Sequence, residues 1–528
     1  MNNKPTLSLS PSPSSTLNTP QSILNNYVKK ILQAHIYDLV NKVPLEKAIN
    51  LSSRYGNNIS LKREDLQAVF SFKLRGAYNK ILQLSEQEKK SGLIVASAGN
   101  HAQGVALSAK RLGINALIVM PKTTPEIKVK AVEFYGASVK LRGNSYDEAY
   151  EYAKQIETDT GRIFIHPYDD EDVIAGQGTI AMEIMQQCDS IPDAIFVPVG
   201  GGGLISGIAV YIKFLYPQIK IIGVEPDDAA CMHDALKAGE RIILEHVGIF
   251  ADGVAVKQVG EKTFHIAQNF VDEILLVSAD EICAAIKDIF DDTRTIMEPA
   301  GALAVAGAKK YINQKNISKQ NLIAITSGAN MNFDRLRHVT ERAEIGEHRE
   351  LLFTSVIDER PGSFRTFCKI IGHRGITEFN YRYCDSNKAQ IFVGVKVNNL
   401  GTERDKIIRS LLDKGYETHD MSDNELAKLH IRYMVGGKSK QVDNERLFRF
   451  QFPERPGALL RFLNKIGQQW NISLFHYRNH GSAYGRVLTG IQVPEEDNQK
   501  FSSYLEELGY PFWEETDNIA YLKFLATD

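Results

Sequence analysis

The last third of the chain is an internal repeat, and this feature constrains the fold more than any other. One copy begins at Arg360 and reads RPGSFRTFCKIIGHRGITEFNYRYCDSNKAQIFVGVKV, and the other begins at Arg455 and reads RPGALLRFLNKIGQQWNISLFHYRNHGSAYGRVLTGIQV, with one inserted residue. Each copy predicts the order strand, RPG turn, helix, strand, turn, strand, helix, strand. Because the register holds over so many positions, we predict two copies of one α+β unit of about 70 to 80 residues, at residues 350–424 and 446–518.

The preceding part of the chain alternates between strand and helix patterns. The β-branched runs GLIVASA, NALIVM and DAIFVPV each precede a stretch of helical periodicity, and NLIAIT ends the series. Such alternation indicates βαβ units and therefore an α/β domain with a doubly wound, mostly parallel sheet covered on both faces. We place this domain at residues 23–343. Ligands bind such sheets where a strand runs into a helix, so we expect functional residues at those junctions.

The composition excludes several classes of protein. The 528 residues include 62 Lys and Arg against 64 Asp and Glu, so a net charge of −2 provides no general attraction for nucleic acid or an acidic membrane. Five cysteines without a CxxC pair fit neither a disulfide framework nor a zinc site. We therefore expect no metal site. We also expect a cytoplasmic protein, because no apolar run reaches the roughly 18 to 20 residues of a spanning helix and the N-terminus lacks a secretory signal.

Residues 1–22 are predicted to form a disordered tail. They are rich in Ser, Pro and Asn with almost no apolar periodicity, so they bury too little surface to offset the entropy of ordering. A transit peptide is the alternative, but the stretch lacks Arg and an amphipathic face.

Lys73 is the first candidate functional residue. Apolar residues recur at helical spacing in SFKLRGAYNK, so Lys73 begins a helix and Ser71 is its expected N-cap. The helix dipole and burial both lower the pKa of an amine at this position. A neutral amine forms a Schiff base with an aldehyde. An ordinary surface lysine is the alternative.

A turn of small residues follows the strand GLIVASA. It carries Ser97 to Asn100 to the start of the next helix, HAQGVALSAKRL. Exposed backbone N–H groups at a helix N-terminus suit a carboxylate or a phosphate, and Asn100 adds a side-chain donor for a ring hydroxyl. A capped turn without a ligand is the alternative.

Four consecutive glycines, Gly200 to Gly203, join the strand DAIFVPV to the helix LISGIAVYIKFL. Their amides can form a nest for a phosphate. A dinucleotide site is the rival interpretation, because Glu225 ends the next strand where a ribose-binding acid would lie. However, Ile205 and Ser206 occupy the place of the third glycine of G-x-G-x-x-G. A merely flexible loop is the third interpretation.

Ser327 follows the strand NLIAIT, in the segment SGAN at the edge of the sheet. A serine hydroxyl can hydrogen-bond a pyridine nitrogen without protonating it, whereas an aspartate makes the ring cationic. The ring would then be a milder electron sink. An ordinary strand-end serine is the alternative.

Together and in this order, the SFK, SAGNH, GGGG and SGAN segments resemble the fold type II, tryptophan-synthase-β-like, enzymes that depend on pyridoxal 5'-phosphate. With the repeat, the chain from about Ile23 onward resembles the biosynthetic threonine deaminases, or L-threonine ammonia-lyases. The resemblance implies a homotetrameric lyase that converts L-threonine to 2-oxobutanoate and ammonia by β-elimination, the first step of isoleucine biosynthesis, and that also accepts L-serine.

The resemblance also implies a role for individual residues. Lys73 would hold the cofactor and, once freed, act as general base, and an uncharged ring nitrogen beside Ser327 would favour elimination over transamination or racemisation. The cofactor would be bound by Lys73, Phe72, Asn100 (at the 3-hydroxyl), Gly200, Gly201, Gly202, Gly203 and Leu204 (at the phosphate), Ser327 (at the ring nitrogen), Gly253 and Glu298. The substrate carboxylate would be bound by Ser97, Ala98, Gly99, Asn100 and His101.

The two repeats resemble ACT-type amino-acid-sensing domains. The resemblance implies that isoleucine binds there as a feedback inhibitor and that valine opposes it. In each RPG turn, Pro fixes the turn and Gly lets an amino acid approach the backbone, although a plain strand-to-helix turn is the alternative. The expected effector residues are Arg360, Pro361, Gly362, Arg455, Pro456 and Gly457.

Two other functions stay open at this point. A serine dehydratase or racemase of the same fold is disfavoured by the paired repeat. A catalytically silent amino-acid sensor is disfavoured because Lys73, Asn100, the glycine run and Ser327 are present together.

Overall fold

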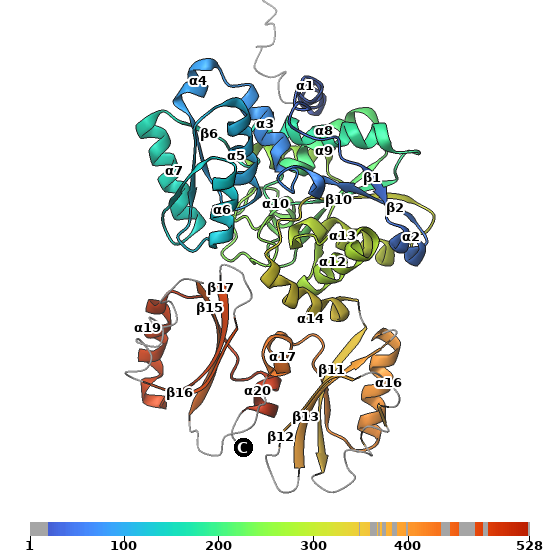
Figure 1. Ribbon diagram of the computed structural model, residues 1–528. Helices are drawn as coiled ribbons and strands as arrows, with labels where there is room; N and C mark the ends of the chain where they lie inside the picture. The colour runs from blue at the N-terminus through green and yellow to red at the C-terminus, as the bar shows by residue number, and fades with distance from the viewer. Residues whose placement is uncertain are drawn as a thin grey trace, which may run out of the picture. The chain divides into compact units, whose positions relative to one another are not determined.

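The computed structural model describes residues 19–347, 349–358, 367, 370–371, 376–382, 388–397, 400–433, 444–453, 470–478 and 484–525. The chain divides into two compact units (Figure 1). The first comprises Met1–Ser278 and Ala285–Met331, and the second Ala279–Ala284 and Asn332–Asp528. The expected boundary at Ala343 therefore falls inside a helix of the second unit, α14 (Leu336–Gly346).

A parallel four-stranded sheet in the first unit has the order β5-β4-β3-β6. Alternating side chains of β3 are buried on opposite faces: Leu93 and Val95 pack with α5, and Ile94 and Ala96 pack with α7. This is the pattern of a parallel strand covered on both sides. The elements are β3 (Leu93–Ala96), β4 (Ala116–Met120), β5 (Ser138–Leu141), β6 (Ile163–Phe164), α4 (Glu86–Ser91), α5 (Asn100–Leu112), α6 (Glu126–Phe134) and α7 (Tyr146–Thr160).

A second, six-stranded sheet has the order β1-β2-β10-β7-β8-β9 and is parallel except for the edge strand β1. Ile195 and Val197 of β7 pack into the core on the side of α8 (Glu171–Gln187) and α9 (Gly203–Leu215). Phe196 contacts Tyr311 of α13 (Pro299–Lys315) at 5.4 Å between ring centroids. The strands are β1 (Leu45–Lys47), β2 (Asn58–Arg63), β7 (Ala194–Pro198), β8 (Lys220–Pro226), β9 (Glu273–Val277) and β10 (Asn321–Thr326).

The predicted α/β domain is thus confirmed, with its strands divided between two parallel sheets. The remaining helices of the first unit lie around and between these sheets (Figure 1). They are α1 (Pro20–Leu32), α2 (Ile49–Tyr55), η1 (Glu64–Leu66), α3 (Lys73–Leu82), α8 (Glu171–Gln187), α9 (Gly203–Leu215), α10 (Cys231–Ala238), α11 (Glu261–Phe270), α12 (Ala279–Thr293), whose first six residues belong to the second unit, and α13 (Pro299–Lys315).

The second unit contains two antiparallel four-stranded sheets, of order β12-β13-β11-β14 and β16-β17-β15-β18. The predicted duplication is therefore present in the backbone. The strands are β11 (Glu350–Asp358), β12 (Ile376–Arg382), β13 (Lys388–Lys396), β14 (Thr418–Asp420), β15 (Glu445–Pro453), β16 (Asn471–Arg478), β17 (Tyr484–Gln492) and β18 (Phe512–Glu514).

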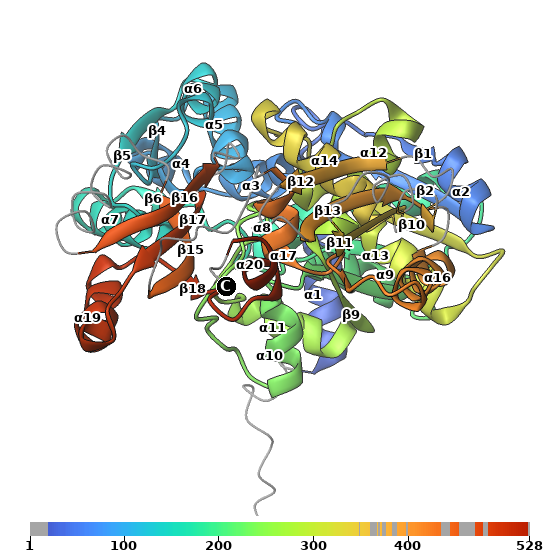
Figure 2. The same ribbon diagram turned by 90° about the horizontal axis from the view of Figure 1, so that it is seen from below.

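Two short helices of the second unit lie between its sheets, and two longer ones cover the outer faces (Figures 1 and 2). Leu426 of α17 and Phe524 of α20 pack in one core with Leu352 of the first sheet and Leu447 of the second. The two copies therefore share a hydrophobic core. The helices are α16 (Leu400–Asp413), α17 (Glu425–Leu429), α19 (Asn498–Leu508) and α20 (Ile519–Phe524), with the short turns η2 (Phe333–Arg335), η3 (Ile431–Tyr433) and η4 (Glu495–Asp497).

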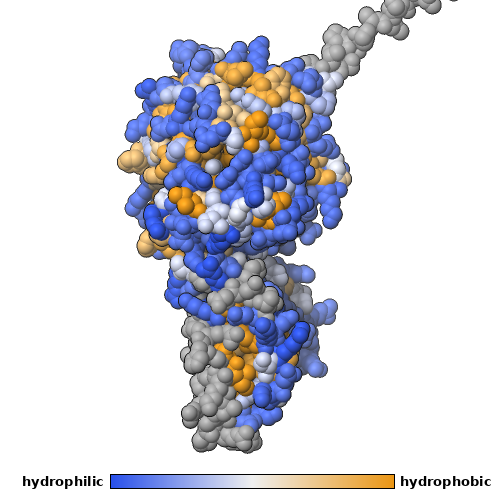
Figure 3. All heavy atoms as spheres, turned by 90° about the vertical axis from the view of Figure 1, so that its right-hand side faces the viewer, coloured by the Kyte–Doolittle hydropathy of each residue, from blue (hydrophilic) through white to orange (hydrophobic). Residues whose placement is uncertain are grey.

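The first helix begins inside the segment that we expected to be a disordered tail. Thr19 caps α1, which starts at Pro20, so residues 20–22 are helical although we expected them in the tail; residues 1–18 lie outside the described part. No described helix has the length and apolar character to cross a membrane. The face drawn in Figure 3 is mainly hydrophilic where it is coloured, with hydrophobic side chains in separate small areas.

Candidate functional site

The segment before Lys73 lies against the end of β10. The Phe72 amide donates to the Ser327 carbonyl at 3.1 Å, and Ser71 forms an antiparallel bridge with Gly328. Lys73 begins α3, as predicted, but Phe72 is its N-cap. The prediction that Ser71 caps the helix is wrong, because the bridge fixes Ser71 one residue too early; within the described residues its buried hydroxyl has no hydrogen-bond partner.

The Lys73 amine lies in a pocket built by distant segments. Its Nζ donates to the Pro167 carbonyl at 3.1 Å and lies 5.2 Å from the centre of the Phe72 ring. Burial lowers the pKa of Lys73 to about 8, while the negative charge of Glu298 acts in the opposite direction. The neutral amine, which is the state that attacks an aldehyde, is therefore much more abundant near pH 7 than in a lysine of ordinary pKa.

Asn100, Glu298 and Ser327 meet on one side of this pocket. Asn100 Nδ2 donates to Glu298 Oε1 at 2.6 Å. A Cβ placed on Gly253 would lie 3.6 Å from the same oxygen. Ser327 is 3% exposed, and its hydroxyl is 3.3 Å from the Ala300 carbonyl. The structure thus brings together four residues that the sequence analysis took from separate segments.

The turn between β3 and α5 presents free amides to the same region. The Gly99 amide donates to Ser97 Oγ at 3.3 Å, whereas the amides of Ala98, Asn100 and His101 have no acceptor among the described residues. His101 Nε2 donates to the Ile165 carbonyl at 2.8 Å. Burial, reinforced by the Lys73 charge, lowers the pKa of His101 to about 3, so this imidazole is neutral.

The glycine run forms a nest of unpaired donors. Within the described chain, the amides of Gly200 through Ile205 donate to no acceptor, and the first amide with one is that of Ser206, bonded to the Gly202 carbonyl. Gly202 has a φ of +95°, and a Cβ on Gly201 would collide with the Tyr168 ring. Buried amides are rarely left without a partner, so this turn fits a bound anion.

His166, Pro167 and Tyr168 are site residues that the sequence analysis missed. Tyr168 lies against Gly201 and Gly203, and its hydroxyl donates to the Gln258 carbonyl at 3.1 Å. His166 Nδ1 accepts the Asp169 amide at 2.8 Å, and burial lowers the pKa of His166 to about 4. The available signal was the HPYD segment after the short strand β6. This segment links the Lys73 amine to the glycine nest.

The structure gives no support to the dinucleotide alternative. Glu225 is fully buried, and its carboxyl oxygens accept the amides of Met232 and His233 at 2.8 Å each. Burial raises the pKa of Glu225 to about 8. The group expected to bind a ribose is therefore used to hold the start of α10.

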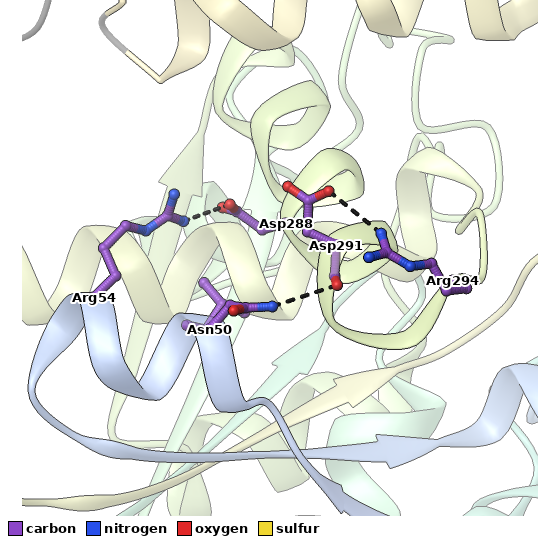
Figure 4. Close-up of a pocket in the computed structure, with 6 residues that line it drawn as sticks. Asn50, Arg54, Asp288, Asp291 and Arg294 are labelled. Atoms are coloured by element: carbon purple, nitrogen blue, oxygen red, sulfur yellow. Dashed lines mark hydrogen bonds and ion pairs between the residues drawn. The ribbon is translucent and has the colours of Figure 1, made fainter.

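A polar pocket of about 340 Å³ between α2 and α12 is not part of this site. Its charged groups pair with one another (Figure 4): Arg54 with Asp288 at 2.5 Å and Arg294 with Asp291 at 3.7 Å. Across the described residues, no group of three or more His, Cys, Asp or Glu side chains is placed to hold a metal ion. The expected effector residues Arg360, Pro361, Gly362, Arg455, Pro456 and Gly457 lie outside the described residues.

The residues around Lys73 fit pyridoxal phosphate. The unpaired amides of the glycine nest suit its phosphate, the low pKa of Lys73 suits its aldehyde, and Asn100 and Ser327 offer uncharged polar groups for its ring. Tyr168 lies against Gly201 and Gly203 of the nest, and the carbonyl of the preceding residue, Pro167, accepts a hydrogen bond from the Lys73 amine.

Comparisons with known proteins agree with this chemistry over both units. Residues 36–328 match the family described as pyridoxal-phosphate dependent enzyme, and residues 341–431 and 436–525 match the C-terminal regulatory domain of threonine dehydratase. The biosynthetic L-threonine dehydratase IlvA of Burkholderia multivorans is 53% identical, over 95% of this chain and 99% of that protein. The IlvA of Escherichia coli is 52% identical, over 95% and 97%.

Solved structures show the same relationship. Threonine deaminase isoform 2 from Solanum lycopersicum, in its processed form, is 51% identical and superposes with a TM-score of 0.60 over 61% of this chain and 88% of that one. A serine racemase from Dictyostelium discoideum is 34% identical, with a TM-score of 0.54 over 58% and 99%. In the sequence comparison, the dehydratases match 95% of this chain. The chain belongs to the pyridoxal-phosphate-dependent biosynthetic threonine dehydratases.

Proposed function

We propose that the protein is an L-threonine ammonia-lyase that converts L-threonine to 2-oxobutanoate and ammonia by β-elimination, the first step of isoleucine biosynthesis. The observation that carries the proposal is the meeting of a low-pKa Lys73 with the unpaired amides of the glycine nest through the Pro167-Tyr168 segment. The match to dehydratases over 95% of the chain supports the choice of substrate.

Lys73 is proposed to carry the cofactor and to act as the base. Bound pyridoxal phosphate supplies an electron sink for the charge that develops at the substrate Cα. Burial lowers the pKa of the Lys73 amine to about 8, so its neutral form is available to accept the α-proton when the amine is free. His101 and His166 are held neutral with pKa values of about 3 and 4. They are too weakly basic to compete for that proton near pH 7, so Lys73 is the base of this pocket.

The other residues are proposed to bind and orient. The amides of Gly200, Gly201, Gly202, Gly203 and Leu204 hold the phosphate, Asn100 the 3-hydroxyl and Ser327 the ring nitrogen, while Phe72, Gly253 and Glu298 line the pocket. The turn from Ser97 to His101 binds the substrate carboxylate, for which the free amides of Ala98, Asn100 and His101 are suited. A neutral Ser327 hydroxyl leaves the ring nitrogen uncharged, which favours loss of the β-hydroxyl.

The second unit is proposed to bind isoleucine as inhibitor, with valine opposing it, through the turns at Arg360 to Gly362 and Arg455 to Gly457. Two copies of one α+β sheet and the family match of this unit support a regulatory role. We further propose a cytoplasmic homotetramer, which light scattering checks as a mass four times that of the chain.

The first test is production of 2-oxobutanoate from L-threonine by the purified, cofactor-loaded protein, with and without isoleucine. We expect isoleucine to suppress turnover and Lys73→Ala to lower it at least about a hundredfold, because the base is lost. L-serine is assayed in parallel, since faster turnover of serine would favour a serine dehydratase. Turnover of threonine that isoleucine does not lower would contradict the proposed regulation but not the proposed reaction. No turnover of either threonine or serine would contradict the proposed lyase activity.

The pH dependence of cofactor capture tests the state of Lys73. The pKa of about 8 means that the amine is protonated below this pH, so the rate at which the unloaded protein binds pyridoxal phosphate should rise about tenfold per pH unit up to pH 8 and then level off. The visible absorption of the bound cofactor reports the rate. N-α-acetyl-lysine is the control, because its pKa of about 10.4 keeps its rate rising beyond pH 9. A protein profile that also rises beyond pH 9 would contradict the lowered pKa.

A further inference from the structure

A chain of side-chain hydrogen bonds runs from the segment before Lys73 to Asn100. Asn330 Nδ2 donates both to the Val69 carbonyl at 2.8 Å and to Asn100 Oδ1 at 2.7 Å. Asn100 Nδ2 in turn donates to Glu298 Oε1 at 2.6 Å. Asn330 is the last residue of the SGAN segment, of which the proposed mechanism uses only Ser327.

The Val69 carbonyl fixes the direction of this chain. A backbone carbonyl can only accept, so the Asn330 atom that faces Val69 must be the NH2 group. The same group faces Asn100, which must therefore present its oxygen, and the Asn100 NH2 then points to Glu298. Rotating the Asn100 amide by 180° would set oxygen against the Glu298 carboxyl and two NH2 groups against each other. The orientations of both amides therefore follow from the hydrogen-bond network and not from a separate choice of O and N for each side chain.

We propose that Asn330 is a positioning residue that fixes the orientation of the Asn100 carboxamide, so that one N–H of Asn100 is held ready for the 3-hydroxyl of the cofactor. The inference rests on the proposed role of Asn100. Of the two N–H bonds of Asn100 Nδ2, one is used by Glu298, and the other has no acceptor among the described residues. With the Asn100 amide held in this orientation by Asn330, this second N–H is the one available to the cofactor 3-hydroxyl.

Asn330 is itself held by the backbone. The Ala329 amide donates to the Phe70 carbonyl at 2.9 Å, and Ser71 pairs with Gly328 in an antiparallel bridge, so residues 328–330 lie against residues 69–71. Phe70 has a φ of +55°, a conformation that costs energy for any residue with a side chain. This strained turn presents the Val69 carbonyl to Asn330 and leads directly into Lys73. The two hydrogen bonds of Asn330 therefore connect Asn100 to the segment that precedes Lys73, the proposed cofactor-linked lysine.

The test replaces the donor by an acceptor. In Asn330→Asp both flanks of Asn100 become carboxyl groups, so neither orientation of the amide is satisfied. We expect cofactor binding to weaken about tenfold, the effect of one lost hydrogen bond to an ordered group. The dissociation constant is measured by titrating the unloaded protein with pyridoxal phosphate and following the visible band, and the pH midpoint of that band is recorded. Asn316→Asp, an exposed helix C-cap, is the control for added charge and should bind normally.

A double variant separates positioning from an independent role. If Asn330 acts through Asn100, adding Asn330→Asp to Asn100→Ala changes neither the dissociation constant nor the pH midpoint by more than about twofold, whereas each single variant changes both in the same direction. Additive effects would overturn the proposal. Normal binding in Asn330→Asp beside weakened binding in Asn100→Ala would overturn the positioning alone, and normal binding in Asn100→Ala would overturn the proposed role of Asn100 and the positioning with it. Asn330→Ser, which is smaller and uncharged, carries the same test if the carboxylate variant does not fold.

Discussion

The two sheets of the second unit share one backbone plan and differ in what their central strands bury. Their strand orders correspond one to one, and each has a register shift at the same place, after Ile376 in β12 and after Ile472 in β16. In the first sheet Val393 pairs with a central phenylalanine of β11, and in the second Thr489 pairs with its counterpart in β15. Both partners are fully buried.

The described part of the second copy contains more buried polar groups without a hydrogen-bond partner than that of the first. In the first sheet Thr354 Oγ1 donates to the Ile391 carbonyl at 3.0 Å. Among the buried side-chain groups described in this copy, only Gln390 Oε1 has no hydrogen-bond partner. Among the described residues of the second copy, the buried groups Thr489 Oγ1, Trp470 Nε1 and Tyr504 OH have no hydrogen-bond partner. A duplicated backbone can thus keep its register while the polar groups of one copy lose their partners, at a cost of about 1 to 3 kcal/mol for each.

The largest expected effect comes from the paired central phenylalanines. Phe353 and Phe448 are both fully buried, so Phe353→Ala and Phe448→Ala should each lower the free energy of unfolding of the second unit by about 3 to 5 kcal/mol. Tryptophan fluorescence during denaturant unfolding is the measurement, because both tryptophans of the chain, Trp470 and Trp513, belong to the second copy.

The shared core makes the first substitution informative. Leu352 and Phe392 of the first sheet pack with Leu447 and Leu488 of the second, so Phe353→Ala should shift the fluorescence transition although it lies in the other copy. A transition unchanged by Phe353→Ala would mean that the two copies unfold independently.

The next expected effect tests the unpaired hydroxyl directly. Thr489→Val removes a buried group without a partner and copies the residue of the first sheet, so it should stabilise the unit by about 1 to 2 kcal/mol. Val393→Thr is the matched reverse change and should destabilise by a similar amount. Denaturation midpoints measure both. A destabilising Thr489→Val would show that the hydroxyl is satisfied in solution.

Much of the fold could be predicted from the sequence, because strand and helix patterns depend on residues that are close together in the chain. Four of the ten strands of the first unit, β3, β4, β7 and β10, lie where the β-branched runs occur, and the repeat predicted the two small sheets. The division of the parallel strands between two sheets was not predicted, since it depends on pairing between distant segments: β2 lies beside β10, with Arg63 opposite Thr326.

The site shows the same limit. Lys73, Asn100 and Ser327 could be found because each ends or begins a predicted element. The HPYD and SGAN segments marked the places of Tyr168 and Asn330, but their roles could not be inferred, because these residues act through contacts with Gly201 and Asn100, 33 and 230 positions away. Ser71 was misplaced because its bridge to Gly328 overrides the local preference for a capping serine.

The smallest expected effect concerns the equivalent asparagines that cap the two inner helices. Asn424 Oδ1 accepts the Ala427 amide at 3.0 Å, and Asn518 Oδ1 accepts the Ala520 amide at 2.9 Å. The copies are not symmetric here, because Asn424 Nδ2 donates to Asn518 Oδ1 at 3.2 Å while Asn518 Nδ2 donates to Glu515 at 2.6 Å.

Each cap should therefore contribute about 0.5 to 1 kcal/mol, with the larger loss in Asn518→Ala, which removes the acceptor used by both copies. The double variant should cost about 0.5 kcal/mol less than the sum of the single ones, since the shared bond is counted twice. Unfolding of the two single variants and the double variant under identical conditions measures this coupling. Equal single effects that add without coupling would mean that the bond between the copies contributes nothing, and that the two caps are as equivalent in energy as they are in sequence.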